Sequence, residues 1–189
     1  MNALFEIEQR ILLWIQSVRQ PWLTPLMRVV THLGDSGALW IGVTAILLIA
    51  GLAYRRRGWS RPALRTGAAC AMAMLLTLIL VNLLIKPLAA RVRPYDAIDR
   101  LTALVGRQKD FSFPSGHSAN SLACAWVLWR ISPRRFGAPA LALAVLIALS
   151  RLYVGVHYPT DVLCGALIGA ALAEVSVRLV RRIPAMREK

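Results

Sequence analysis

Acidic residues are scarce in this chain: its 189 residues include 9 Asp or Glu against 23 Lys or Arg. Two-metal hydrolytic sites are built on clustered acidic ligands, so that class of site is not expected here. Cysteine is scarcer still, and Cys70, Cys124 and Cys164 fall in separate apolar runs. Their scatter excludes a metal quartet and gives no obvious disulfide, so we expect buried structural thiols.

Apolar and basic residues, in contrast, are abundant. Hydrophobic residues make up 57% of the chain, above the roughly 45–50% usual for soluble domains. The formal net charge of +14 would indicate a nucleic-acid partner in a soluble protein. Here the basic residues cluster at the ends of apolar runs, which is typical of membrane topology and leaves no groove for a phosphate backbone. We therefore expect a membrane protein that binds no nucleic acid.

Five stretches are apolar and long enough, or nearly so, to cross a bilayer, which takes about 20 residues in a helix. They are residues 36–54, 64–86, 115–131, 136–152 and 159–180, of which the third and fourth are short. The chain thus predicts an all-α fold, a polytopic membrane helical bundle. We expect one domain over residues 1–189, with residues 36–180 forming the transmembrane bundle.

Residues 1–34 precede that bundle and have a different pattern. The stretch "ALFEIEQRILLWIQSVR" alternates apolar and charged positions at helical spacing, with Trp14 on the apolar side. This pattern predicts an interfacial amphipathic helix. Residues 21–33 form a second short segment, and the two together leave open a sixth span, so we expect five to six transmembrane helices. Asp35 and Ser36 are the predicted N-caps of the helix that follows.

Basic residues are concentrated in alternate loops, which predicts the orientation of the bundle. They are Arg55, Arg56, Arg57, Arg61 and Arg65 after the first span, Arg130, Arg134 and Arg135 after the third, and five Lys or Arg against Glu188 from Arg178 onward. The positive-inside rule makes this side cytoplasmic. Residues 86–115 and 150–161 then share the opposite side, so we expect a bacterial-type cytoplasmic membrane with these segments on the extracytoplasmic face.

Three motifs meet on that outer face. They are "KPLAARVRP" from Lys86, "FPSGHS" at residues 113–118 and "SRLYVGVHYPTD" at residues 150–161. Together they bring three cations, two histidines and one carboxylate to three helix ends. A charged side chain at membrane depth costs a few kcal/mol or more, so such residues are functional candidates by default.

The cations and one helix start predict a phosphate site. Lys86, Arg93 and Arg151 offer charged donors suited to phosphate oxygens. Ser115 is the predicted N-cap of its helix, which leaves the N–H groups of Gly116 and the next residue free to bind an anion. Gly116 also lets the backbone approach a ligand closely. Two histidines and an aspartate are sufficient ligands for zinc, but three neighbouring cations would repel the ion, so we expect no metal.

The two histidines have different predicted roles. Tyr158 precedes Pro159, which suits Pro159 as the first residue of a helix and places Asp161 in its first turn. A carboxylate that accepts the Nδ1–H of His157 leaves its Nε2 free to attack phosphorus. His117 has no such local partner, so we expect it to protonate the leaving oxygen. The residues thus indicate covalent catalysis assisted by a general acid.

In order and spacing, the three motifs resemble the signature motifs of the type 2 phosphatidic acid phosphatase superfamily. The resemblance covers Lys86 to Asp161 and shows no departure within the motifs. It implies a metal-independent phosphohydrolase without a cofactor that forms a phosphohistidine intermediate. The implied catalytic residues are His157, Asp161 and His117, and the implied phosphate-binding residues are Lys86, Arg93, Ser115, Gly116 and Arg151.

The resemblance also bears on the substrate. Small bacterial members of the family resemble undecaprenyl diphosphate phosphatases, which favours conversion of undecaprenyl diphosphate to undecaprenyl phosphate. Other members act on phosphatidylglycerophosphate, phosphatidate or lipid A, and the motifs do not choose among these lipids. The connector of residues 95–113 carries Arg100, Arg107 and Lys109, which are expected to touch a second phosphate and so favour a diphosphate.

Two non-enzymatic classes compete with a lipid phosphatase. A transporter would need ionisable residues near the middle of the bilayer. Only Glu174 lies well inside an apolar run, and it is close to the cytoplasmic end of that run. A membrane scaffold would need none of the three motifs. The sequence therefore favours an enzyme whose partners are a lipid phosphate and the surrounding membrane lipids.

Overall fold

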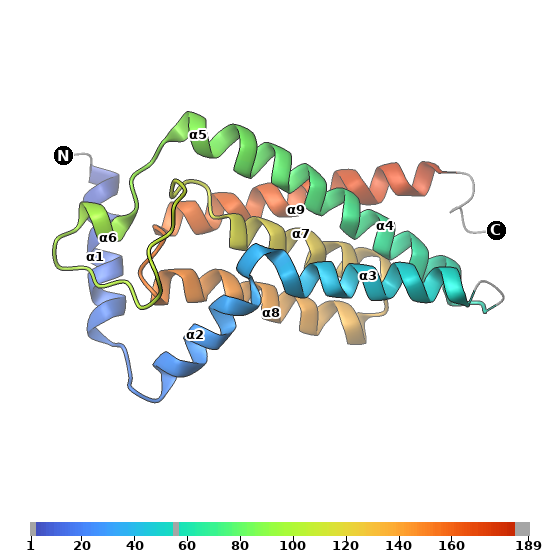
Figure 1. The fold of residues 1–189 in the computed structure, drawn as a ribbon, viewed down its shortest axis with the longest axis horizontal. Helices are drawn as coiled ribbons and strands as arrows, with labels where there is room; N and C mark the ends of the chain where they lie inside the picture. The colour runs from blue at the N-terminus through green and yellow to red at the C-terminus, as the bar shows by residue number, and fades with distance from the viewer. Residues whose placement is uncertain (1–2, 55–56, 184–189) are drawn as a thin grey trace.

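The structure is a computed structural model that describes residues 3–54 and 57–183. Every regular element in these residues is a helix, which confirms the all-α prediction. Five long helices run along one common axis (Figure 1): α3 (Ala38–Ala53), α4 (Ser60–Thr77), α7 (Gly116–Ile131), α8 (Arg134–Tyr153) and α9 (Pro159–Arg182). The predicted basic residues Arg55 and Arg56, and the tail beyond residue 183, lie outside the described residues.

Four stretches within the described residues are long and apolar enough to cross a membrane: Asp35–Ala53, Ser60–Ala97, Arg134–Tyr153 and Pro159–Arg182. The fifth predicted span corresponds to α7, which has 16 residues and a length of about 24 Å at 1.5 Å per residue. α7 lies at the centre of the bundle against α4, α8 and α9. The chain is a multi-pass membrane protein, and α7 is packed against three of its other long helices.

Large apolar side chains face outward from this bundle and small ones fill its interior. Ile46, Ile49 and Leu167 are exposed. The buried small residues of α4 and α7 are Ala69, Cys70, Ala73, Ala119, Ala123, Cys124 and Ala125. Such an inverted distribution suits a lipid environment, where packing between helices depends on small residues. The expected burial of the cysteines is confirmed for Cys70 and Cys124, whereas Cys164 is only partly buried.

Two glycines bring α7 and α9 into backbone contact. A Cβ atom added to Gly165 would lie 2.5 Å from the Ser115 carbonyl oxygen, and one added to Gly169 would lie 2.1 Å from that of Ala119. Glycines four residues apart are a recurring device for close helix packing in membranes. This contact holds the start of α7 against the start of α9, where two of the three motifs lie.

The second span is longer than the predicted residues 64–86, and it is not α-helical throughout. α4 continues through a π-helical segment, η2 (Leu78–Ile85), into α5 (Lys86–Ala89). π-helical turns are rare and often accompany functional sites. The change in helical repeat alters the direction in which the side chains after it point, beginning with Lys86.

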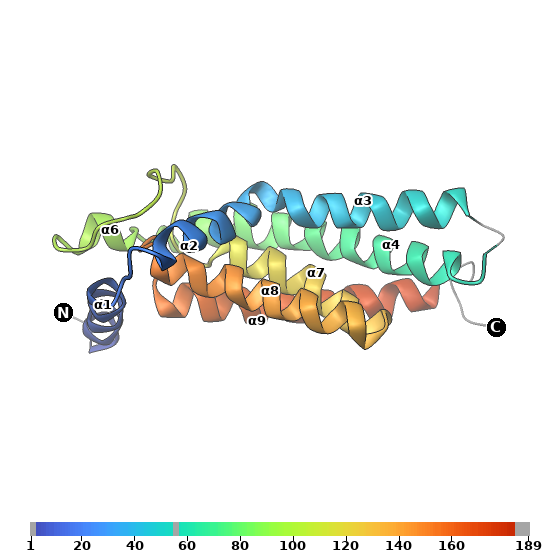
Figure 2. The same ribbon diagram turned by 90° about the horizontal axis from the view of Figure 1, so that it is seen from below.

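The N-terminal region confirms the predicted first helix. α1 (Ala3–Ser17) lies crosswise over one end of the bundle, and α2 (Leu23–Leu33) leads from it to α3 (Figures 1 and 2). Neither helix is a candidate span. α1 exposes Leu4, Ile7 and Trp14 and buries Glu8 and Leu12. Part of its apolar surface therefore faces away from the protein, and part packs against it.

The predicted N-caps of the next helix are wrong. α3 begins after Gly37, which has a positive φ of 68°, and no side chain caps it. Asp35 and Ser36 lie instead in a short 3₁₀ turn, η1 (Asp35–Gly37). The Asp35 carboxylate is unable to cap α3 because it is engaged by two histidines, described below.

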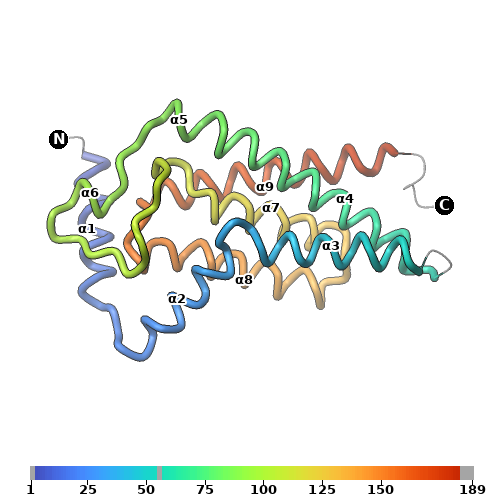
Figure 3. The backbone as a smooth tube through the Cα atoms, in the orientation of Figure 1, coloured from blue at the N-terminus to red at the C-terminus, as the bar shows by residue number. Residues whose placement is uncertain are grey.

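The two ends of the bundle differ as the loop charges predict. The start of α4, the α7–α8 turn and the end of α9 lie at one end, and α1, α5 and α6 (Pro94–Ala97) lie at the other (Figure 3). The described basic loop residues therefore share one end, and the three motifs share the opposite end.

Candidate active site

The structure brings the three motifs together where α5 begins, α7 begins, and α8 gives way to α9. Arg93 Nη1 lies 3.4 Å from His157 Nε2. Arg151 is close enough to Arg93 and to both motif histidines to interact with them electrostatically. All eight residues that the sequence singled out thus lie in or directly around one site.

His157 and Asp161 form a buried pair. His157 Nδ1 lies 3.4 Å from Asp161 Oδ2, and their side chains are 1% and 0% exposed. The local sequence explains this arrangement: Tyr158 has extended backbone, Pro159 begins α9, and Asp161 lies in its first turn. The same carboxylate accepts hydrogen bonds from the Tyr158 N–H at 2.9 Å and from the Ser112 hydroxyl. These bonds fix the oxygen that faces the imidazole.

Burial keeps the His157 ring neutral. Removal from water lowers the pKa of His157 to about 3, despite the nearby Asp161 carboxylate, and the charges of Arg151 and Arg93 act in the same direction. With Nδ1–H directed to the carboxylate, Nε2 is unprotonated at neutral pH, and its lone pair faces Arg93 Nη1 at 3.4 Å. This is the protonation state that a nucleophile requires.

Two of the three cations predicted to bind phosphate share one carboxylate. The Asp110 carboxylate pairs with Lys86 Nζ and, at 2.6 Å, with Arg93 Nη2. Burial alone would raise the pKa of Asp110, but the hydrogen bond and charge of Lys86 and the charge of Arg93 lower it to about 2. Arg151 interacts electrostatically with Asp110 and also with Asp35. A phosphate bound by the three cations would therefore compete with the Asp110 carboxylate for Lys86 and Arg93.

Arg151 has unused hydrogen-bonding capacity. Its Nη1 donates to Thr31 Oγ1 at 2.6 Å, and its buried Nε has no hydrogen-bond partner among the described residues. A buried donor without a partner costs free energy, so the site favours a ligand that supplies an acceptor. A phosphate oxygen fits that requirement.

The start of α7 confirms the predicted cap. Ser115 has extended backbone, and its hydroxyl accepts a hydrogen bond from the Ser118 N–H at 3.3 Å. A Cβ atom on Gly116 would lie 3.0 Å from Asn82 Oδ1 and 3.8 Å from Lys86 Nζ. Gly116 therefore leaves the space beside Lys86 open to a ligand.

His117 has a partner that sequence analysis did not find. Its Nε2 lies 2.8 Å from Asp35 Oδ1, and the other Asp35 oxygen lies 2.6 Å from His32 Nδ1. Asp35 orients the His117 ring and stabilises the charge that the ring carries when protonated. His32 is largely exposed, so this chain of three side chains leads from His117 toward the surface.

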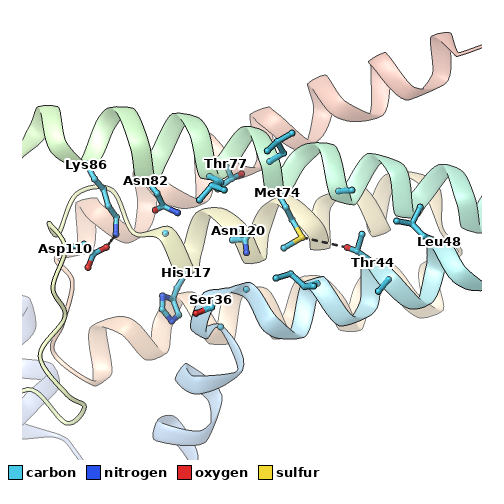
Figure 4. A pocket seen from close by; sticks show the side chains of 18 residues that line it. Ser36, Thr44, Leu48, Met74, Thr77, Asn82, Lys86, Asp110, His117 and Asn120 are labelled. Atoms are coloured by element: carbon cyan, nitrogen blue, oxygen red, sulfur yellow. Dashed lines mark hydrogen bonds and ion pairs between the residues drawn. The ribbon is translucent and has the colours of Figure 1, made fainter.

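A cavity of about 730 Å³ leads away from the site between α3 and the second span. Lys86, Asp110 and His117 lie at one end of it and Thr44 and Leu48 at the other, as Figure 4 shows. The wall is mainly apolar, with two amides, Asn82 and Asn120, about one helical turn below the charged end. The shape and lining suit a lipid whose phosphate lies at the charged end.

The basic residues of the connector, residues 95–113, do not lie where a second phosphate was expected to bind. Arg100, Arg107 and Lys109 do not line the cavity, and Arg107 pairs with Asp96 at 3.0 Å on the surface. The predicted contact with a second phosphate therefore has no support in the described structure. The connector residue that faces the cations is Asp110, which immediately follows Lys109 and carries the opposite charge.

Two further residues at the site were not identified from the sequence. Ser112 binds Asp161, and Arg91 Nη1 donates to Asp161 Oδ1 at 2.6 Å. The only sequence signal for either is position: Arg91 lies inside the first motif and Ser112 directly precedes the second. Among the described residues, no group of three or more His, Cys, Asp or Glu is arranged to hold a metal ion.

Comparisons with known proteins agree with this geometry. The profile of the PAP2 superfamily matches residues 66–184. Over 187 residues the chain is 35% identical to phosphatidylglycerophosphatase B of Bacillus subtilis. This alignment covers 91% of the present chain and 82% of the relative. The chain is also 31% identical over 141 residues to undecaprenyl-diphosphatase of Sulfolobus acidocaldarius. That alignment covers 75% of the present chain and 63% of the relative.

The fold is also similar to a solved structure. The crystal structure of a transmembrane PAP2-type phosphatidylglycerolphosphate phosphatase from Bacillus subtilis matches with a TM-score of 0.78 at 29% identity. The match covers 99% of this chain and 90% of the other. The similarity therefore includes the N-terminal helices as well as the bundle.

Proposed function

The chain belongs to the PAP2 superfamily and is a metal-independent lipid phosphatase, and we propose that it cleaves a phosphate ester of a membrane lipid through a phosphohistidine at His157. The observation that carries this proposal is a buried, neutral imidazole 3.4 Å from a phosphate-binding arginine. An adjoining, mainly apolar cavity has Lys86 at its charged end and leads away from the site.

Bond formation begins at His157. Its Nδ1–H is directed to Asp161, so Nε2 attacks phosphorus. As the N–P bond forms, the bond from phosphorus to the lipid oxygen breaks, and His117 gives that oxygen its proton. The lipid leaves as an alcohol, and the phosphoryl group stays on His157.

Water completes the cycle. His117, which has lost its proton, takes one from a water molecule while the water oxygen attacks the phosphohistidine. The N–P bond breaks, inorganic phosphate is formed, and both histidines return to their starting states. In both steps Lys86, Arg93 and Arg151 hold the phosphate oxygens, together with the N–H groups at the start of α7.

The substrate that this geometry favours is a glycerolipid phosphomonoester such as phosphatidylglycerophosphate. Within the cavity, Lys86 is the only cation among the lining residues, and the groups next below it are the neutral amides Asn82 and Asn120. Amides suit the hydroxyl and ester oxygens of a glycerol backbone better than a second phosphate. The extensive similarity to the Bacillus subtilis enzyme supports the same choice.

Undecaprenyl diphosphate, the substrate favoured by the sequence, is the second candidate. The relative from Sulfolobus acidocaldarius supports it. The decisive experiment measures phosphate release by the purified protein in detergent with EDTA, on phosphatidylglycerophosphate, phosphatidate, undecaprenyl diphosphate and lipid A. We expect full activity in EDTA and the highest kcat/KM on phosphatidylglycerophosphate. Loss of turnover that added magnesium restores contradicts the mechanism, and no release from any lipid would indicate a transporter or scaffold.

The site faces the extracytoplasmic side of a cytoplasmic membrane in this proposal. Its support is the excess of basic residues in the loops at the other end of the bundle. In a variant without the natural cysteines, Asp99→Cys should react with an impermeant thiol reagent in spheroplasts, and Arg57→Cys should not. The reverse labelling pattern contradicts this orientation.

A further inference from the structure

α1 carries a buried carboxylate that membrane anchoring does not explain. Its outward face is apolar, yet Glu8 on the inward face is 1% exposed. Burying a carboxylate is unfavourable unless charged or hydrogen-bonding groups compensate it. The groups that compensate Glu8 belong to the active-site end of the bundle rather than to α1.

Arg91 connects Glu8 to the carboxylate behind the nucleophile. Arg91 Nη2 pairs with Glu8 Oε2, and Arg91 Nη1 donates to Asp161 Oδ1 at 2.6 Å. The guanidinium carbon also lies 3.8 Å from the centre of the Tyr158 ring. The second oxygen of Glu8 accepts the Thr160 N–H at 3.1 Å and the Thr160 hydroxyl. α1 is thus bonded directly to the first turn of α9.

The charges in this cluster suggest why two carboxylates are present. Asp161 has to support the positive charge that the His157 ring acquires when it is phosphorylated. The Arg91 guanidinium holds the Asp161 carboxylate in place, but its positive charge also cancels the negative charge of Asp161. With Glu8 on the other side of Arg91, the three groups together carry one negative charge, which matches the single charge on the ring.

We propose that Glu8 and Arg91 are positioning residues that orient Asp161 and preserve one net negative charge behind His157. The inference rests on the proposed function, because it assigns these residues to the formation of the phosphohistidine. It also gives α1 a part in catalysis: an interfacial helix completes the charge balance of the site.

A purely structural role predicts a different result from the same substitutions. If Glu8 and Arg91 only dock α1, removing both bonding partners should harm the protein at least as much as removing one. If the charge balance matters, Glu8→Gln leaves Arg91 cancelling Asp161, whereas adding Arg91→Gln returns one net negative charge. The double variant is therefore the informative one.

The test measures kcat, KM and the melting temperature for Glu8→Gln, Arg91→Gln and the double variant, in detergent on phosphatidylglycerophosphate. We expect each single substitution to lower kcat by about 10- to 100-fold and to change KM by less than about threefold. Losses of this size are typical when a residue that orients a metal ligand from the second layer is replaced. We expect the double variant to recover at least about fivefold in kcat over Glu8→Gln. A double variant slower than both single variants overturns the proposal.

Matched controls separate charge balance from folding. Glu6→Gln removes the exposed carboxylate of α1, and Arg107→Gln removes an arginine that also stacks on a tyrosine and pairs with an aspartate; both should keep wild-type kcat. Arg91→Lys retains the charge and should stay within about fivefold of wild type. If Arg91→Lys folds normally but loses as much kcat as Arg91→Gln, the proposal is wrong.

Failure of this inference is distinguishable from failure of the proposed function. If His157→Ala is inactive and the double variant shows no recovery, the nucleophile is right and the role of Glu8 and Arg91 is wrong. If His157→Ala keeps wild-type kcat, the proposed function itself fails, and this inference with it.

Discussion

The two ends of the bundle both contain ion pairs, but they bury them to different degrees. At the basic end, Glu174 pairs with Arg130 at 3.0 Å and with Arg178 at 3.1 Å, and the two arginine side chains are 41% and 72% exposed. At the other end, Asp161 and Glu8 are enclosed on both sides of Arg91. Exposed pairs contribute only about 0–1 kcal/mol, whereas buried charges are costly and persist where they have a use. The buried carboxylates of Glu8 and Asp161 thus distinguish one cluster at the active-site end, because that end also carries surface pairs such as Arg107–Asp96.

The strongest test of this contrast removes one group from each end. His157→Ala should lower kcat by about 10⁴-fold or more, because the bond-forming nitrogen is lost. Glu174→Gln, at the basic end, should leave kcat within about twofold of wild type, because its pairs are exposed. Phosphate release measured on a lipid phosphate checks both. Comparable losses in the two variants would remove the distinction between the ends.

A somewhat smaller loss is expected at the second histidine. His117→Ala should lower kcat by about 10²–10⁴-fold through loss of acid catalysis. An aryl phosphate has a good leaving group, so it should recover part of its rate in His117→Ala and none in His157→Ala. The measurement is the ratio of aryl to lipid phosphate turnover in each variant. Recovery in His157→Ala alone would mean that the two roles are interchanged.

A moderate effect is expected where Asp110 holds the binding cations. The Asp110 carboxylate occupies Lys86 and Arg93 and so competes with phosphate for them. Asp110→Asn should therefore tighten inhibition by inorganic phosphate by about 5- to 10-fold, corresponding to roughly 1–1.4 kcal/mol. The matched control is Asp96→Asn, because Asp96 pairs with an arginine on the surface. Equal or weaker inhibition in Asp110→Asn would show that the carboxylate does not compete.

The smallest expected effect is on stability at acidic pH. The pKa of His157 is lowered by burial to about 3, whereas an unfolded histidine titrates near pH 6.5. Between these values the unfolded chain binds a proton that the folded protein does not, so stability falls as the pH falls through this window. The melting temperature of His157→Gln should depend less on pH between 7 and 4.5 than that of the wild type. Parallel curves would contradict the burial of a neutral ring.

Local chemistry made much of the site predictable from sequence. The Ser115 cap, the helix start at Pro159 and the nearness of His157 to Asp161 each depend on residues within a few positions of one another. Such short-range relations follow from backbone preferences alone. The apolar runs likewise predicted the long helices, and the loop charges predicted that the basic loops share one end of the bundle.

Partners that are distant in the sequence were not predictable. Asp35 reaches His117 across 82 residues, and Glu8 reaches Arg91 across 83. Both contacts depend on how α1, α2 and η1 pack, which periodicity does not specify. The amphipathic pattern of α1 predicted an interfacial helix, but it gave no sign that Glu8 is buried. The charge of the connector residues also did not predict which of them faces the site. Asp110 contacts Lys86 and Arg93, whereas Arg107 and Lys109 do not line the cavity.

The glycine contact between α7 and α9 has a consequence for how this protein can change over evolutionary time. Gly165 and Gly169 press together the backbones of α7, which carries His117, and α9, which carries Asp161 and begins two residues after His157, so almost any side chain there would displace the reacting groups. The cavity wall on α3 at Ile41 and Ala45 is not held in such a contact, whereas Leu48 packs closely against Gly67 of α4. Single substitutions on α3 are therefore free to alter the accepted lipid chain while the chemistry is inherited unchanged. A new substrate preference requires no new catalytic centre.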